Sequence, residues 1–146
     1  MTVIFKNEVP YIEGINLNKL VKLVPTPFYV YSQKSIAEAY FEIQNKLKKK
    51  IFYSIKANSN QAVIAFINSL GAGADVVSME EMQRALSAGI NPNKIIYEGV
   101  GKSQSDIVNA IQNKIRQINV ESIEELLQIN AIGESLSKNV NIGLRI

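Results

Sequence analysis

Two residue types that enzymes often use are missing from this chain of 146 residues: it has no cysteine and no histidine. The missing thiol excludes a cysteine nucleophile, a disulfide and a thiolate metal site within these residues. The missing imidazole excludes a Ser/His or Cys/His pair and a histidine metal ligand. Any chemistry must therefore use lysine, arginine, aspartate, glutamate, serine or tyrosine. That set favours a lysine acting with a carbonyl cofactor, and we expect no metal.

The sequence also lacks an apolar run long enough to span a bilayer and a signal-peptide pattern at its N-terminus, so we expect a cytoplasmic protein with no membrane partner. With 47% hydrophobic and 20% charged residues, the composition is that of a globular domain. The net charge is only +3, and the basic residues are scattered apart from residues 48–50. Such a run is typical of a solvated helix end. We therefore expect no nucleic-acid partner.

The first part of the chain has an irregular pattern. Residues 2–15 alternate loosely between apolar and polar and predict strand, with a turn near Pro10. A short helix is expected over residues 18–24, capped by Asn16 or Asn18.

Two further elements are predicted before residue 50. Residues 28–31 have the aromatic and β-branched composition of a strand. Residues 32–49 form the clearest helix, with a possible capping box at Ser35 and Glu38. One stripe of this helix is apolar: Ile36, Tyr40, Ile43 and Leu47.

From residue 51 onward, predicted strands and helices alternate. The expected strands are residues 51–57, 74–77, 95–98, 117–120 and 140–146. Ser78 and Ser122 are each followed three residues later by glutamate, a capping-box pattern, and Ser103 begins a third helix. In the helix after Ser122, three residues are expected to face inward: Ile123, Leu126 and Leu127. The alternation predicts βαβ units with a parallel sheet, either doubly wound or a (β/α)₈ barrel.

Polar residues interrupt the apolar strands near their carboxyl ends: Lys56, Asp75, Glu98, Glu121 and Arg145. In barrels, active sites lie on that rim. Residues 51–57 predict a strand in which Phe52, Ser54 and Lys56 share one face. Lys56 then either reaches solvent at the strand end or is buried and chemically used, because an unpaired buried ammonium is costly.

Six segments, taken in order, resemble the N-terminal half of the diaminopimelate decarboxylases. The segments are residues 26–31, 53–58, 73–81, 99–103, 118–122 and 143–146. These enzymes belong to the barrel-type pyridoxal-phosphate decarboxylases, together with ornithine and arginine decarboxylases. The resemblance implies an α/β chain that forms the N-terminal portion of a pyridoxal-phosphate-binding (β/α)₈ barrel of the alanine racemase type. Residues 1–31 would join a separate β-domain, and residues 32–146 would form the partial barrel.

The resemblance also implies roles for three residues. Lys56 would form the Schiff base with pyridoxal 5′-phosphate and be the catalytic residue. Asp75 and Arg145 would bind the cofactor together with it. Taken from the residues alone, Asp75 is equally a plain ion-pair partner of a nearby lysine, and Arg145 is equally a strand-end arginine in solvent. The loop at residues 99–103 favours an ordinary connection between strand and helix over a phosphate cradle.

The function implied is decarboxylation of meso-diaminopimelate to L-lysine, a step of lysine biosynthesis with a small amino-acid substrate, in a homodimer when the enzyme is complete. The alternatives are another decarboxylase of the same fold, acting on ornithine, arginine or a polyamine precursor, or a non-catalytic shortened homologue. A barrel requires eight strand–helix units and about 250 residues. We therefore expect the 146-residue chain to be a truncated barrel, inactive alone and prone to self-association.

Overall fold

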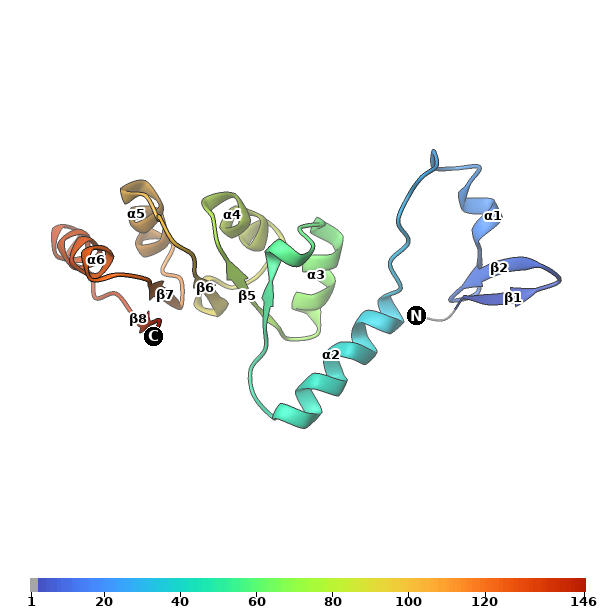
Figure 1. Cartoon of the computed structure of the whole chain (residues 1–146), viewed down its shortest axis with the longest axis horizontal. Coiled ribbons are helices and arrows are strands. Elements are labelled where there is room, and N and C mark those ends of the chain that lie inside the picture. The colour runs from blue at the N-terminus through green and yellow to red at the C-terminus, as the bar shows by residue number, and fades with distance from the viewer. Residues whose placement is uncertain (1–2) are drawn as a thin grey trace. The chain divides into compact units, whose positions relative to one another are not determined.

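The structure is a computed structural model that describes residues 3–146. Residue 2, where the first predicted strand begins, lies outside the described residues. The chain forms two compact units, Met1–Lys48 and Lys49–Ile146, and their elements are labelled in Figure 1. The domain division expected between residues 31 and 32 remains a prediction.

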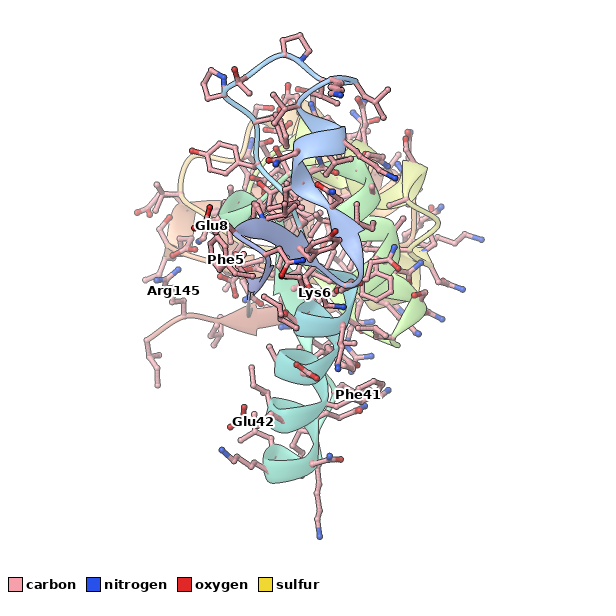
Figure 2. All side chains as sticks on the ribbon, turned by 90° about the vertical axis from the view of Figure 1, so that its right-hand side faces the viewer. Phe5, Lys6, Glu8, Phe41, Glu42 and Arg145 are labelled. Carbon is pink, nitrogen blue, oxygen red and sulfur yellow. The ribbon has the colours of Figure 1, made fainter. Side chains whose placement is uncertain are left out.

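The first unit contains a three-stranded antiparallel sheet in the order β1 (Ile4–Lys6), β2 (Val9–Ile12) and β3 (Ile15–Asn16). Figure 2 labels Phe5, Lys6 and Glu8 on the β1–β2 hairpin. The hairpin turns at Asn7 and Glu8, where φ is +49° and +66°. Two positive φ values in a two-residue turn match the twist of the flanking strands. The turn predicted near Pro10 is therefore wrong, because Pro10 lies inside β2 opposite Phe5.

Two helices follow in the first unit, α1 (Leu17–Leu20) and α2 (Gln33–Leu47). Asn16 caps α1, as predicted. For α2 the capping box expected at Ser35 and Glu38 is wrong, because the Ser32 hydroxyl accepts the Ser35 N–H at 3.0 Å and so caps the helix one turn earlier. Of the predicted apolar stripe, Tyr40 is buried, while two members are exposed: Ile43 and Leu47. Figure 2 shows Phe41 and Glu42 projecting from different sides of this helix.

Residues 28–31 do not form the predicted strand. A strand requires a neighbour to pair its backbone groups, and no described strand lies against this segment. Tyr29 is instead 89% exposed, and its ring stacks near that of Tyr31 with centroids 6.4 Å apart.

The second unit is a five-stranded sheet whose strands are all parallel and lie in chain order. The strands are β4 (Phe52–Ser54), β5 (Gly73–Val76), β6 (Ile95–Tyr97), β7 (Gln117–Val120) and β8 (Ile142–Leu144). The connecting helices are α3 (Gln61–Ser69), α4 (Met79–Ser87), α5 (Gln104–Gln112) and α6 (Ile123–Ser135), with short 3₁₀ turns η1 (Ile55–Ala57) and η2 (Pro92–Lys94). Because right-handed crossovers in one direction place every helix on the same face, this order indicates a barrel wall and not a doubly wound sheet. Figure 1 shows α3 to α6 in a row along the strands.

The two faces of this sheet differ in burial. The helix-covered face carries the core, and its strand residues are almost fully buried: Ala74, Val76, Ile95, Tyr97, Ile118 and Val120. Burying each of the valine and isoleucine side chains in this set contributes roughly 1.5–3 kcal/mol. The opposite, inner face is half-buried and mostly polar near the carboxyl ends: Ser54, Asp75, Ile96, Asn119 and Gly143. The fold therefore presents the polar strand ends together on one rim.

Serine caps start three of the barrel helices, as predicted, but the capping boxes expected at Ser78 and Ser122 are wrong, because their glutamates accept the N–H of the residue before the serine; the complete capping box lies at Ser103 and Asp106. The Ser122 hydroxyl accepts the Glu125 N–H at 3.2 Å, and Glu125 Oε2 accepts the Glu121 N–H at 2.8 Å. α6 then turns Glu125, Ile129 and Ile132 inward. The prediction that Ile123 and Leu127 face inward is wrong, because they are 72% and 64% exposed; Leu126 packs partly against the core.

Candidate functional site

Lys56 lies at the carboxyl end of β4, within the turn η1. β4 ends at Ser54, so the strand alternation expected to place Phe52, Ser54 and Lys56 on one face stops before the lysine. Ile55 is fully buried and anchors the turn, while Lys56 is exposed. Within residues 3–146, Lys56 has no hydrogen bond or ion pair. The turn therefore fixes the backbone of Lys56, while its side chain extends into solvent.

Asp75 lies on β5 directly opposite Ser54 of β4. Asp75 Oδ1 and Ser54 Oγ are both buried and lack a hydrogen-bond partner among the described residues. Leaving a buried polar atom unpaired costs about 1–3 kcal/mol. Burial raises the pKa of the Asp75 carboxyl, and the negative charges of Glu98 and Glu81 add to this, while the Ser54 hydroxyl and the Lys56 ammonium oppose it. Lys56 and Asp75 therefore lie at the carboxyl ends of neighbouring strands, and their shared role at a cofactor stays a prediction.

A chain of polar side chains continues along the inner face. Gln117 donates to Asn119 Oδ1 at 2.6 Å, and Asn119 Nδ2 donates to Glu98 Oε1 at 2.7 Å. A Cβ added to Gly143 would lie 2.4–2.5 Å from the ends of the Gln117 and Asn119 side chains, so a larger residue on β8 would force these side chains to move. Sequence reasoning placed Glu98 at a strand end but did not assign it a role.

Arg145 lies just beyond β8, the opposite edge strand from β4. Arg145 Nη1 lies 3.4 Å from Glu121 Oε1, and the arginine side chain is 62% exposed. Glu121 Oε1 also accepts the Gly99 N–H at 3.1 Å. The structure thus places Arg145 on the same rim but against Glu121, and not against Lys56 or Asp75.

Lys102 is the residue whose environment the sequence did not reveal. Its side chain is 2% exposed. Its Nζ donates to Gly99 O and Asn119 O, both at 2.7 Å, and to the Glu125 carboxylate at 3.1 and 3.3 Å. The lysine of the loop after β6 is therefore a buried cross-link, and the expectation that this loop is not a phosphate cradle stays a prediction. The sequence offered one signal for this burial, which was Glu125 in the first turn of α6, the helix that follows β7.

Other features of the described residues lie away from this rim. A groove of about 590 Å³ runs between α6 and β8, and it is lined by none of Lys56, Asp75 and Arg145. Within residues 3–146 no group of three or more histidine, cysteine or carboxylate side chains could hold a metal ion. None of the described helices combines the length and the apolar character needed to cross a membrane.

A family model matches residues 33–146, which is most of the chain, and it is described as the pyridoxal binding domain of the pyridoxal-dependent decarboxylases. The chain belongs to this family. The predicted family is thereby confirmed.

Curated relatives carry the similarity along nearly the whole chain. A diaminopimelate decarboxylase from Helicobacter pylori is 42% identical over 134 residues, 90% of this chain and 33% of the relative. One from Aquifex aeolicus is 41% identical over 138 residues, 93% of this chain and 33% of the relative. The chain therefore spans about a third of the length of these relatives.

A solved structure agrees. The crystal structure of diaminopimelate decarboxylase from Helicobacter pylori complexed with L-lysine covers 90% of this chain and 34% of that chain. Its TM-score is 0.87 and its sequence identity 40%. The predicted fold class, part of a decarboxylase barrel, is confirmed.

The residues at the rim fit a pyridoxal cofactor. Such a cofactor offers an aldehyde, and Lys56 offers an accessible amine with no partner in the described residues. The cofactor also carries polar groups. Ser54 Oγ and Asp75 Oδ1 are buried atoms that lack a hydrogen-bond partner among the described residues. In native structures buried polar atoms are rarely left unpaired without a reason, and a ligand is one such reason.

Proposed function

We propose that this chain is the cofactor-binding part of a decarboxylase that converts meso-diaminopimelate to L-lysine, with Lys56 as the residue that holds pyridoxal 5′-phosphate. The observation that carries the proposal is an exposed Lys56 amine and a buried Asp75 Oδ1, both without a hydrogen-bond partner among the described residues, at the carboxyl ends of neighbouring parallel strands. The names of the relatives support the substrate.

Each proposed residue has a task at this rim. An amine attacks a carbonyl only when unprotonated, and among the described residues the Lys56 amine has no hydrogen bond that would have to break first. Asp75 would bind the cofactor beside Lys56, and burial raises the pKa of its carboxyl. When bound, the cofactor supplies an electron-accepting ring for the charge left as carbon dioxide departs.

Arg145 remains a proposed cofactor-binding residue. Its guanidinium is largely exposed and has one long contact, 3.4 Å to Glu121. A planar, always-charged group in that state is available to an anionic ligand such as a phosphate. Replacement of Arg145 by methionine should weaken cofactor binding while Lys56 remains reactive.

The complete enzyme is further proposed to be a cytoplasmic homodimer acting in lysine biosynthesis, with the 146-residue chain inactive by itself. Two measurements, each made on the chain and on the complete protein, test activity and assembly. Carbon dioxide release from diaminopimelate tests the activity, and the solution mass tests the homodimer. Saturable decarboxylase activity of the isolated chain would contradict the proposal that the 146-residue chain is inactive by itself.

The test of Lys56 is chemical trapping. In the complete protein, borohydride reduction should attach the cofactor to the peptide that contains Lys56, and Lys56→Ala should abolish the attachment. Lys94→Ala is the matched control, because Lys94 is also exposed but lies at the amino end of β6. Attachment to any other lysine would overturn the proposal.

A further inference from the structure

The buried lysine of the second unit is bound on several sides. Lys102 Nζ contacts two backbone carbonyls and both oxygens of Glu125, and it lies 5.8 Å from the centroid of the Tyr97 ring. An ammonium with 2% of its side chain exposed is tolerated only when so paired. The two carbonyls belong to Gly99, just after β6, and to Asn119 on β7. Lys102 therefore ties together the carboxyl ends of two neighbouring strands.

The same two strand ends carry side chains on the inner face. Glu98 precedes Gly99, and its N–H still bonds to Val76 O at 2.8 Å, which continues the pairing of β5 and β6. Asn119 Nδ2 donates to Glu98 Oε1 at 2.7 Å. The spacing between Lys102's two carbonyl anchors thus sets the spacing between the backbones that carry Glu98 and Asn119.

Glu98 in turn lies near Asp75. Asp75 pairs in register with Ile96, so Glu98, two residues later, is its diagonal neighbour on the same face. The charged and polar groups that act on Asp75 come from every surrounding element: Lys56 of η1, Ser54 of β4, Glu81 of α4 and Glu98. Of these groups, only Glu98 is held by an amide that Lys102 positions.

We propose that Lys102 is a positioning residue of this site: by fixing the ends of β6 and β7 it keeps the Asn119 amide on Glu98 and the Glu98 carboxylate beside Asp75. The relevance of this positioning to catalysis rests on the proposed function, which gives Asp75 its place near the cofactor. The geometry itself does not depend on a bound cofactor.

The test is a titration of Asp75 in the cofactor-free chain, followed by carbon-detected NMR of the assigned carboxyl. Glu98→Gln should lower the midpoint, because a neighbouring negative charge is removed. Lys102→Met should also lower it, by releasing Glu98. If Lys102 acted on Asp75 only through its positive charge, removing that charge would raise the midpoint of the Asp75 titration. The direction of the shift therefore separates a positioning role from a direct electrostatic one.

Three further variants keep the outcome decisive. In the Glu98→Gln background, Lys102→Met should cause no additional shift, since coupled residues are non-additive. Asn119→Ala removes the amide but leaves the backbone carbonyl that Lys102 binds, so it should reproduce the shift if Lys102→Met does not fold. Lys94→Met, at an exposed lysine, should change nothing. An unchanged or raised midpoint in folded Lys102→Met, or additive effects of Lys102→Met and Glu98→Gln, would overturn the inference; if Lys102→Met does not fold, an unchanged or raised midpoint in Asn119→Ala would do so. Failure of the cofactor proposal leaves this result untouched.

Discussion

Lys56 and Lys102 occupy comparable places in two strand–helix units of the parallel sheet that are separated by the β5 unit. Each lies in the loop after a strand, β4 or β6, and each is followed by a strand whose helix begins with a serine–glutamate cap. The cap glutamates are Glu81 and Glu125, and each accepts a backbone N–H of its own loop. Yet Lys102 is buried against Glu125, while Lys56 is exposed and unpaired within the described residues.

The loops explain the difference. The loop after β6 contains Gly99 and Gly101, with φ of +96° and +75°, conformations that glycine adopts without strain. They let the chain fold back so that Lys102 enters the sheet end. The loop after β4 is a tight turn pinned by the buried side chain of Ile55, which leaves Lys56 outside. Burial of one lysine stabilises the wall, and exposure of the other leaves an amine available for chemistry.

The largest expected effect is on stability. Lys102→Met should cost about 3–5 kcal/mol, because it leaves the Glu125 carboxylate buried without its partner. Lys56→Met should change stability by less than about 0.5 kcal/mol, as for other exposed positions. Urea unfolding of the two variants measures both. Equal losses would remove the contrast between the lysines.

A second variant sharpens the cause of that loss. Adding Glu125→Gln to Lys102→Met should recover part of the stability, with a coupling of roughly 1–3 kcal/mol between the two sites. The amide removes the uncompensated charge, and its oxygen can still accept the Glu121 N–H. Strict additivity would mean that the loss arises from packing alone and not from the buried pair.

The sequence predicted those features that depend on local chemistry. The caps at Ser78 and Ser122 follow from a serine three residues before a glutamate, and the strands follow from short apolar runs between turns. Lys102 could not be predicted, because its burial depends on carbonyls and a carboxylate brought together only by strand pairing. For the same reason residues 28–31 have strand composition but form no strand, since no described partner pairs with them.

Lys56 and Asp75 were identified through resemblance and not through periodicity. Strand alternation placed Lys56 on the face of Ser54, whereas the strand ends before it. The part of the interpretation that does not depend on strand alternation is the position of both residues at the carboxyl ends of neighbouring strands. In a parallel sheet these ends lie at the same edge. Arg145 follows the same rule but lies at the other edge of the sheet, where Glu121 is its partner.

Asp75 supplies a prediction with a defined pH dependence. Burial raises its pKa above the ordinary 3.8, so ionisation is easier in the unfolded chain. Its contribution to stability is therefore present below that ordinary value and is lost as the pH rises through the folded-state pKa. Asp75→Asn should stabilise the chain at neutral pH, and the gain should vanish as the pH falls. Unfolding curves at several pH values measure this.

Glu13 in the first unit provides the control of opposite sign. Hydrogen bonds from the Ser32 hydroxyl and the Lys34 N–H lower the pKa of Glu13 from its ordinary 4.5. Its stabilising contribution is present above that value and is lost as the pH falls through the folded-state pKa. Glu13→Gln should therefore lower the free energy of unfolding at neutral pH and leave it unchanged in acid.

For Asp75, the contradicting outcome is a stability difference between Asp75→Asn and wild type that does not vary with pH. Such a result would contradict the interpretation of Asp75 as a buried carboxyl.

The smallest expected effect compares two serine hydroxyls. Ser54 Oγ is buried without a partner among the described residues, whereas Ser122 Oγ accepts the Glu125 N–H at 3.2 Å. Ser54→Ala removes an unsatisfied polar atom and should be neutral or stabilising by up to about 1 kcal/mol. Ser122→Ala removes a helix cap and should cost about 1 kcal/mol. If Ser54→Ala instead destabilises as much as Ser122→Ala, the Ser54 hydroxyl has a partner in the free chain, and the rim beside Lys56 is already satisfied without a cofactor.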